Sequence, residues 1–215
     1  FLVGLGFFED ERLVVEQYFL EELGDERPVL ELLAERLSDP EVTLVSFNGK
    51  SYDEPLVATR AVLHRLPWRR TAGHVDLVHC ARRIYRGTMS RMRLQDLERE
   101  HFGFRRERDI DGAEIPEAYF AYLRHRRPHA MNRVITHNLH DIVALAALVG
   151  HLTDGLDVLD RRDAPEVQLG RARVAYRVGD VERALAFAAE AAVGGGAPEC
   201  TFDARRLAAA SVLVG

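Results

Sequence analysis

The stretch "VSFNGKSYDEP", Val45 to Pro55, decides the fold that this sequence predicts. A run of strand-forming residues ends at Asn48-Gly49, a pair that is typical of tight turns. Asp53 follows the turn, and Pro55 suits the first turn of a helix because its missing N–H has no partner there. The stretch therefore predicts a buried strand, a turn and a helix, with one carboxylate at the junction.

Strands and helices are also predicted on either side of this stretch. Residues 1–8 and 12–20 are β-rich and are separated by an acidic loop, which predicts a hairpin. Residues 26–38 carry apolar side chains at helical spacing, and a helix is also expected over residues 54–65. The order β-β-α-β-α predicts an α/β domain.

The second half of the chain is mostly helical by its pattern. "HVDLVHCARRIYR" starts extended and becomes helical, "MRLQDLEREHFGF" is a short helix, and "IPEAYFAYLRH" begins with a proline in its first turn. The last helix of the domain is expected over residues 131–152. We therefore expect one α/β domain over residues 1–154.

A polar linker over residues 155–165 precedes an alanine-rich helical segment over residues 166–215. This segment resembles a tetratricopeptide-type helical hairpin, with Gly179-Asp180 at the turn. One repeat is fewer than an independent stack needs, so a generic helical extension remains the alternative.

Charge is unevenly distributed along the chain. The net charge is −5, but residues 60–133 hold 17 basic against 9 acidic residues, and all 17 are arginine. Arginine binds phosphate through a planar, bidentate guanidinium, so nucleic acid is a candidate partner. A solvated arginine-rich surface is the alternative interpretation of the same composition.

Two cysteines, Cys80 and Cys200, and no secretory pattern favour a reducing, cytoplasmic location. The apolar residues occur in short runs, so no membrane crossing and no membrane partner are expected. The opening "FLVGLGFFEDER" has no initiator methionine, and we interpret it as a strand of a chain that lacks its true beginning.

Asp53, His137 and Asp141 are the candidate chemical residues. His137 and Asp141 stand four residues apart and so share one helix face. Mg²⁺ and Mn²⁺ prefer carboxylate oxygens, and a histidine can take a proton from an attacking water molecule.

Each residue also has an ordinary structural interpretation. Asp53 could be only a helix N-cap, and His137 with Asp141 could be only an i,i+4 surface pair. A zinc site that adds His140 lacks a further suitably spaced cysteine or histidine.

The motifs together point to a known family. Asn-x3-Tyr-Asp after a strand and His-Asn-x2-Asp opening a helix resemble the second and third motifs of the DEDD exonuclease superfamily. With "FLVGLG", "HVDLVHCARRIYR" and "DIDGAEIPEAYFAYLR", they resemble the bacterial YprB-type, RNase H-like exonuclease family over about residues 1–152. The resemblance implies an RNase H-like mixed sheet flanked by helices and two-metal hydrolysis of phosphodiesters, with Mg²⁺ or Mn²⁺.

By this resemblance, Asp53 and Asp141 are metal ligands, and His137 orients or deprotonates the attacking water. Asn48 is expected to fix the turn or to contact nucleic acid, and Asp76 is expected to be structural. Candidate contacts to the phosphate backbone of single-stranded or end-exposed nucleic acid are Lys50, Arg82, Arg83, Arg91 and Arg93.

The first motif of the superfamily, Asp-x-Glu, is not in these 215 residues. In the family it lies on a strand that precedes "FLVGLG" in the sequence and sits between "FLVGLG" and "TLVSF" in the sheet, so the active site of this chain is expected to be incomplete. The leading hypothesis is a metal-dependent 3′–5′ exonuclease. The alternatives are a non-catalytic nucleic-acid-binding module and a protein-interaction scaffold built on the C-terminal helices.

Overall fold

A computed structural model of the chain describes residues 2–68, 71, 73–126 and 128–214. The chain forms two compact units: unit 1 is Phe1–Asp76 with Leu97–Ala147, and unit 2 is Leu77–Asp96 with Leu148–Gly215. Each unit combines two separate stretches of the chain, whereas the sequence predicted a single boundary at residue 154. That boundary stays a prediction.

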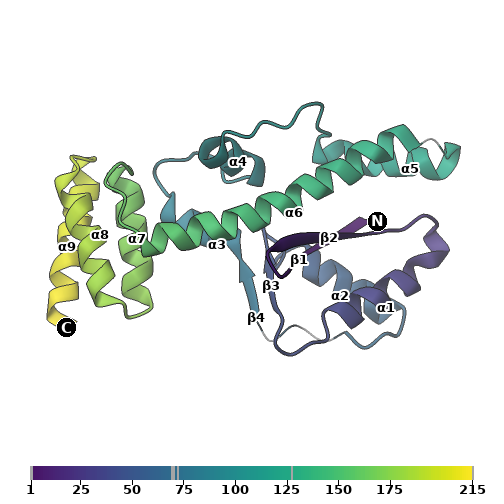
Figure 1. The fold of residues 1–215 in the computed structure, drawn as a ribbon, viewed down its shortest axis with the longest axis horizontal. Helices are drawn as coiled ribbons and strands as arrows, with labels where there is room; N and C mark the ends of the chain where they lie inside the picture. Colours follow the sequence, from purple (N-terminus) through teal and green to yellow (C-terminus); the bar gives the residue numbers. More distant parts are fainter. Residues whose placement is uncertain (1, 69–70, 72, 127, 215) are drawn as a thin grey trace. The chain divides into compact units, whose positions relative to one another are not determined.

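Unit 1 contains all the strands of the described residues (Figure 1). The predicted order β-β-α-β-α is present, with one 3-10 turn inserted before the first helix. In chain order the elements are β1 Leu2–Glu9, β2 Arg12–Phe19, η1 Leu23–Asp25, α1 Glu26–Arg36, β3 Thr43–Ser46, α2 Asp53–Leu63 and β4 Gly73–Asp76. They are followed by the part of α4 Leu94–Phe102 that starts at Leu97, by η2 Gly112–Glu114 and α5 Ile115–His125, and by the first part of α6 Pro128–Asp157.

The strands pair in both directions. β1 and β2 form the predicted antiparallel hairpin, with Leu2 opposite Phe19. β3 and β4 are parallel, with Ser46 opposite Asp76. Within the described residues no ladder joins the two pairs. The parallel pair brings the ends of two strands to the same edge, where β3 leads into the turn before α2 and β4 ends at an aspartate.

The hairpin packs closely on helix α6 through two glycines on one face of β1. A Cβ atom at Gly4 would collide with the side-chain oxygen of Asn138, and one at Gly6 would collide with Ile142. The side-chain nitrogen of Gln17 in β2 donates to Oδ1 of Asn138 at 2.9 Å. A larger residue at either position would push these side chains aside, so the two glycines of β1 let the hairpin lie close to the helical turns that carry the candidate site.

The core of unit 1 joins α5, α6 and the hairpin. The hydroxyl of buried Tyr119 donates to the carbonyl oxygen of Leu20 at 2.9 Å, which ties α5 to the end of β2. The buried residues of this cluster are Ile110, Ala118, Tyr119, Met131 and Val134, with Leu2, Phe19, Ile115, Tyr122 and Leu123 packed against them.

Helix α6 is longer than predicted and continues through Gly155, which had been assigned to a linker. The guanidinium of Arg171 packs on Gly155, with Nη2 3.0 Å from the position of a Cβ atom, so packing overrides the weak helix propensity of glycine. By length and composition alone, Met131–Asp157 could cross a membrane, which is weak evidence because core helices pass the same test.

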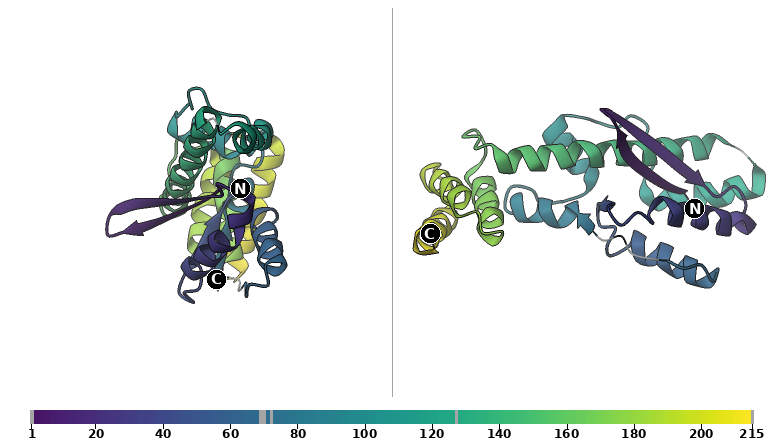
Figure 2. Two further views of the ribbon diagram at one scale, coloured as in Figure 1. Left: turned by 90° about the vertical axis from the view of Figure 1, so that its right-hand side faces the viewer. Right: turned by 60° about the horizontal axis from the view of Figure 1, so that its bottom comes forward.

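Unit 2 is helical in its described residues: α3 Leu77–Ile84, α7 Pro165–Arg177, α8 Val181–Val193 and α9 Pro198–Val214, with the end of α6. Helices α7, α8 and α9 lie side by side (Figure 2). The turn at Gly179-Asp180 forms as expected: Gly179 has φ +84° and the Asp180 side chain caps α8 by accepting from the Arg183 N–H at 3.0 Å. The tetratricopeptide interpretation itself stays a prediction.

Candidate active site

Helix α2 begins at Asp53, and Tyr52 occupies the N-cap position without a side-chain capping bond. The N–H of Glu54 bonds to the carbonyl oxygen of Gly49 at 2.9 Å, so backbone atoms of the preceding turn satisfy the helix start. The N-cap interpretation of Asp53 is therefore wrong. Its carboxylate is left available for another role.

Asp53 lies close enough to Asp76 and Asp141 to be affected by both charges. Partial burial of the carboxylate raises the pKa of Asp53, its own backbone N–H lowers it, and the two negative charges raise it further. The residue as a whole remains exposed, so solvent ions can reach it. The carboxylates of Asp53 in α2, Asp76 in β4 and Asp141 in α6 thus lie close enough for their charges to interact.

Asp76 has a structural task in this group, as predicted. It is buried, and its two carboxylate oxygens accept the backbone N–H groups of Asn48 at 2.7 Å and Lys50 at 3.1 Å. Asn48 has φ +66°, a left-handed conformation that asparagine tolerates better than most residues. Asp76 therefore holds the turn that delivers Asp53. The roles of the Asn48 and Lys50 side chains toward nucleic acid stay predictions.

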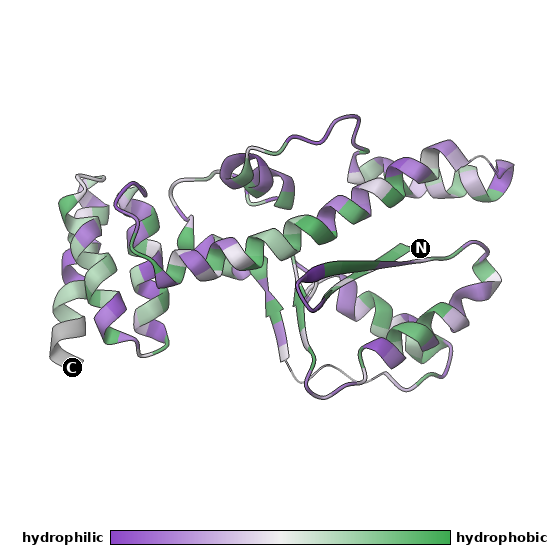
Figure 3. Ribbon diagram, viewed as in Figure 1, coloured by the Kyte–Doolittle hydropathy of each residue, from purple (hydrophilic) through white to green (hydrophobic). Residues whose placement is uncertain are grey.

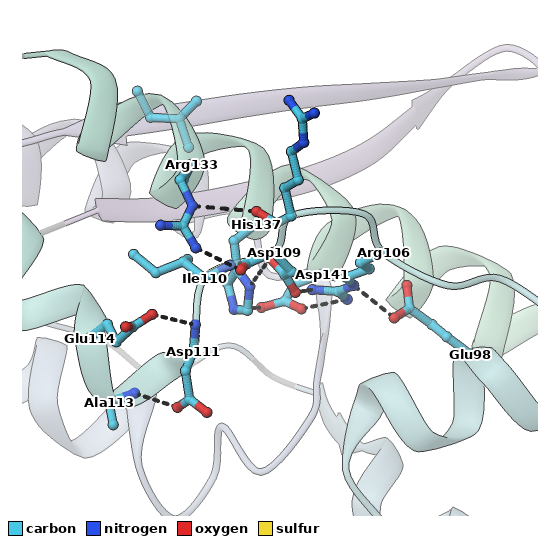
Figure 4. Close-up of polar contacts among 12 residues, drawn as sticks. Glu98, Arg106, Asp109, Ile110, Asp111, Ala113, Glu114, Arg133, His137 and Asp141 are labelled. Atoms are coloured by element: carbon cyan, nitrogen blue, oxygen red, sulfur yellow. Dashed lines mark hydrogen bonds and ion pairs between the residues drawn. The ribbon is translucent and has the colours of Figure 1, made fainter.

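A buried arginine connects the acidic groups around Asp141 (Figure 4). The side chain of Arg106 is 4% exposed. Its Nε lies 2.8 Å from Oε2 of Glu98, its Nη2 lies 2.8 Å from Oδ1 of Asp141, and its Nη1 lies 3.5 Å from Oδ2 of Asp109. Burial lowers the pKa of Arg106, but Glu98 and Asp141 raise it by more, so the guanidinium stays charged.

His137 lies between two aspartates. Its Nδ1 is 2.8 Å from Oδ1 of Asp109, and its Nε2 is 3.4 Å from Oδ2 of Asp141. Burial raises the pKa of Asp109, but the bond to His137, together with the Ile110 N–H and Arg106, lowers it by more. An ionised carboxylate only accepts, so Nδ1 carries the hydrogen in the contact with Asp109, and Nε2 is the ring nitrogen next to Asp141.

A comparison with known protein families identifies the superfamily of the chain. A family model described as the RNase_H superfamily matches residues 1–153. The chain belongs to the RNase H superfamily. The predicted α/β class, with a mixed arrangement of strands and flanking helices, is thereby confirmed, as is the resemblance to the YprB-type family.

One curated protein is similar to the chain, and its name states no activity. "Uncharacterized protein YprB" of Bacillus subtilis (strain 168) is 35% identical over 169 residues. The match covers 77% of this chain and 40% of the relative, so the chain spans less than half of that protein. No solved structure shows significant similarity to the chain.

Two further residues of the candidate site, Arg106 and Asp109, were not predicted. They lie in the hydrophilic loop between α4 and η2 (Figure 3), where charge density gives no periodic signal. Their spacing of three residues could have suggested a local ion pair, but not the pairing with α6. His137 and Asp141 share a helix face as predicted, yet they belong to this network and are not an isolated surface pair.

The described residues do not complete a metal site. They contain no group of three or more His, Cys, Asp and Glu side chains placed to hold one ion. Arg106 also engages one oxygen of Asp141. The zinc alternative fails because the His140 ring packs edge-on against Phe104, with centroids 5.6 Å apart, and joins no ligand cluster among the described residues. Asp53 and Asp141 have suitable oxygen donors for Mg²⁺ or Mn²⁺, but further ligands are needed.

The predicted arginine contacts all lie in unit 2. Arg82 and Arg83 are on α3, and Arg91 and Arg93 are in the segment before α4. All four side chains belong to exposed residues, as a role in phosphate contact requires. Lys50, in unit 1, is also exposed.

Proposed function

We propose that this chain belongs to a metal-dependent 3′–5′ exonuclease that hydrolyses phosphodiester bonds of DNA or RNA by a two-metal mechanism. Membership of the RNase H superfamily suggests nuclease activity on nucleic acids and, more generally, use of divalent metals. The observation that carries the proposal is the position of His137 beside Asp141, with Nε2 3.4 Å from Oδ2, while Asp53 lies near enough for the charge of Asp141 to raise its pKa.

Each residue of the candidate site has a distinct role in the proposed reaction. Asp109 holds the Nδ1–H of His137, so that Nε2 can accept a proton from water. Asp53 and Asp141 contribute carboxylate oxygens to the metal site, which the superfamily's Asp-x-Glu motif would complete. A bound metal pair would supply an activated water and stabilise the leaving oxygen. Arg106 fixes the orientation of Asp141 through Oδ1.

The same cluster also supports a second candidate function. The positively charged guanidinium of Arg106 already pairs with the carboxylate of Asp141. The described residues also hold no complete metal site. An RNase H-like module that binds nucleic acid without cutting it is consistent with both facts. A protein-binding role of the C-terminal helices and a cytoplasmic location also remain proposals.

The test uses the natural protein that contains this chain, with Mn²⁺ and oligonucleotides labelled at either end. We expect stepwise shortening from the 3′ end and its loss on addition of a chelator. Asp53→Asn and Asp141→Asn should abolish cleavage while retaining oligonucleotide binding, because each removes a metal ligand and keeps the side-chain shape. Asp10→Asn, at the tip of the β1–β2 hairpin, is the matched control and should cleave normally.

Two results would contradict the exonuclease proposal. Binding without degradation, unaffected by Asp53→Asn and Asp141→Asn, supports the non-catalytic module. Absence of an Asp-x-Glu pair from the residues preceding this chain in the natural protein also contradicts the two-metal mechanism, because two of its acidic ligands would be missing.

A further inference from the structure

We infer that unit 2 contains a nucleic-acid contact site of its own, an arginine-lined groove between the end of α3 and helix α7 that binds the phosphate backbone of a strand. The groove has a volume of about 580 Å³. Its walls carry Arg82, Arg83 and Arg86 on one side and Arg173 and Arg177 on the other. The choice of nucleic acid as the occupant rests on the proposed function.

A glycine allows the two walls to approach. Gly170 of α7 lies against the backbone at the end of α3, where a Cβ atom would collide with the carbonyl oxygen of Ile84 and lie 2.7 Å from that of Arg83. These backbone atoms cannot move aside as a flexible side chain could. Gly170 therefore sets the spacing between the two rows of arginines, which come from segments far apart in the sequence.

The groove concentrates positive charge: five arginines line it, whereas Glu166 lies beside one lining residue, Gly87. No acidic residue is among its lining residues. Arg173 pairs with Asp203 at 2.6 Å, but this pair is about half exposed. In the part of the chain that the structure describes, the remaining four arginines of the walls make no ion pair. Several guanidinium groups held around one hollow repel each other, so an anion that enters it is stabilised.

The arrangement suits a strand better than a single phosphate. Arg173 and Arg177 are four residues apart on one face of α7, about 6 Å along the helix axis. With the opposite wall they form an extended field of planar donors, each able to bind phosphate oxygens bidentately. Half-buried Met89, Met92 and Val174 also line the groove and offer apolar contact to bases or sugars. Such contacts bind backbone without sequence choice.

This groove changes the role expected for the C-terminal helices. Arg82 and Arg83 were predicted as phosphate contacts, whereas Arg86, Arg173 and Arg177 were not. Two of these come from α7, in the segment interpreted as a protein-interaction repeat. Helix α7 is therefore assigned to nucleic-acid binding.

The test measures binding of a fluorescein-labelled single-stranded oligonucleotide by anisotropy, using the full chain in the presence of a chelator. The groove variant combines Arg86→Ala and Arg177→Ala, and the control combines Arg162→Ala and Arg205→Ala, which removes the same charge from exposed positions of unit 2 outside the groove. Equal urea unfolding midpoints will show that all variants fold.

We expect the groove variant to bind roughly tenfold more weakly and the control to bind nearly normally. The slope of log affinity against log salt should fall in magnitude by about 1.4, since each lost contact to a single strand contributes about 0.7. A variant with Arg86→Lys and Arg177→Lys should bind with intermediate affinity, because it keeps charge but loses bidentate geometry.

Unchanged affinity and salt slope in the groove variant would overturn the inference, as would an equal loss in the control. Weakened binding to anionic phospholipid vesicles with normal oligonucleotide binding would assign the groove to a membrane surface and also overturn it. Failure of the nuclease proposal is distinguishable. A protein that cuts nothing but loses binding through the groove variant supports this inference alone, and one that cuts while the groove variant binds normally contradicts it.

Discussion

Nδ1 of His137 lies 2.8 Å from Oδ1 of Asp109, which comes from a loop 28 residues earlier in the chain. The contact fixes both the ring orientation and the hydrogen position, because an ionised carboxylate can only accept. It gives a histidine on a helix face a defined ring orientation, with Nε2, the proposed base, 3.4 Å from Oδ2 of Asp141.

Asp109→Asn is expected to lower the nuclease rate by roughly 100-fold, because an amide can donate to Nδ1 and so favour the tautomer with a protonated Nε2. Oligonucleotide affinity should stay the same. Cleavage and anisotropy assays on the same preparation check both. The control is Asp111→Asn, since asparagine also caps the turn that Asp111 begins. Equal activity of the two variants would show that Asp109 does not position His137.

Arg106→Gln is expected to destabilise the fold by about 3 kcal/mol, because it leaves the buried carboxylate of Glu98 without its charged partner. Urea unfolding at neutral pH measures the change. The stability of Arg106→Lys should lie between that of the unsubstituted chain and that of Arg106→Gln. Lysine keeps the charge but cannot bind several carboxylates at once as the planar guanidinium does. The neighbouring exposed Arg105→Gln should change stability by less than about 0.5 kcal/mol. A similar loss in both glutamine variants would contradict the buried-network explanation.

Glu26 should make unit 1 sensitive to acid. Hydrogen bonding from Arg60 lowers the pKa of Glu26, burial opposes this, and the bond to His64 lowers it further, so the pKa lies below the ordinary value of 4.5. A depressed carboxylate pKa gives stability that is present above the unfolded value and is lost as pH falls through the folded value. The free energy of unfolding should therefore drop below about pH 4.5.

Glu26→Gln tests this assignment. The variant should be about 2 kcal/mol less stable at pH 7, because a charged hydrogen-bond acceptor is lost, and its stability should depend less on pH between 5 and 3. Urea titrations across this range measure both. Glu31→Gln, an exposed partner of Arg27, is the control. An unchanged acid dependence in Glu26→Gln would mean that other carboxylates determine it.

Gly170→Ala is expected to cost about 1–3 kcal/mol, because the new Cβ meets the backbone at Ile84 and forces α7 away from α3. The matched control is Gly150→Ala, another glycine within a helix, around which a Cβ would meet nothing within 4 Å. There alanine should stabilise by up to about 1 kcal/mol through helix propensity. Thermal or urea unfolding shows whether each substitution raises or lowers the free energy of unfolding. Stabilisation by Gly170→Ala would refute the close packing.

Local sequence patterns were sufficient for most elements of the fold. The turn after β3, the start of α2, the hairpin and the proline-led α5 follow from short-range rules, so their positions were predicted within a few residues. The end of α6 was not, because packing of Arg171 on Gly155 outweighs a local breaker signal. The N-cap interpretation of Asp53 failed for a similar reason, since backbone atoms of the turn took that task.

The sequence by itself determined the family, the order of the elements and the three candidate residues Asp53, His137 and Asp141, because these depend on neighbours within a few positions. The tertiary structure alone decided that Arg106 and Asp109 join His137 and Asp141, and that arginines of α3 and α7 face one groove. Such contacts unite segments far apart in the chain. Their existence depends on burial and close packing, which short-range patterns do not encode.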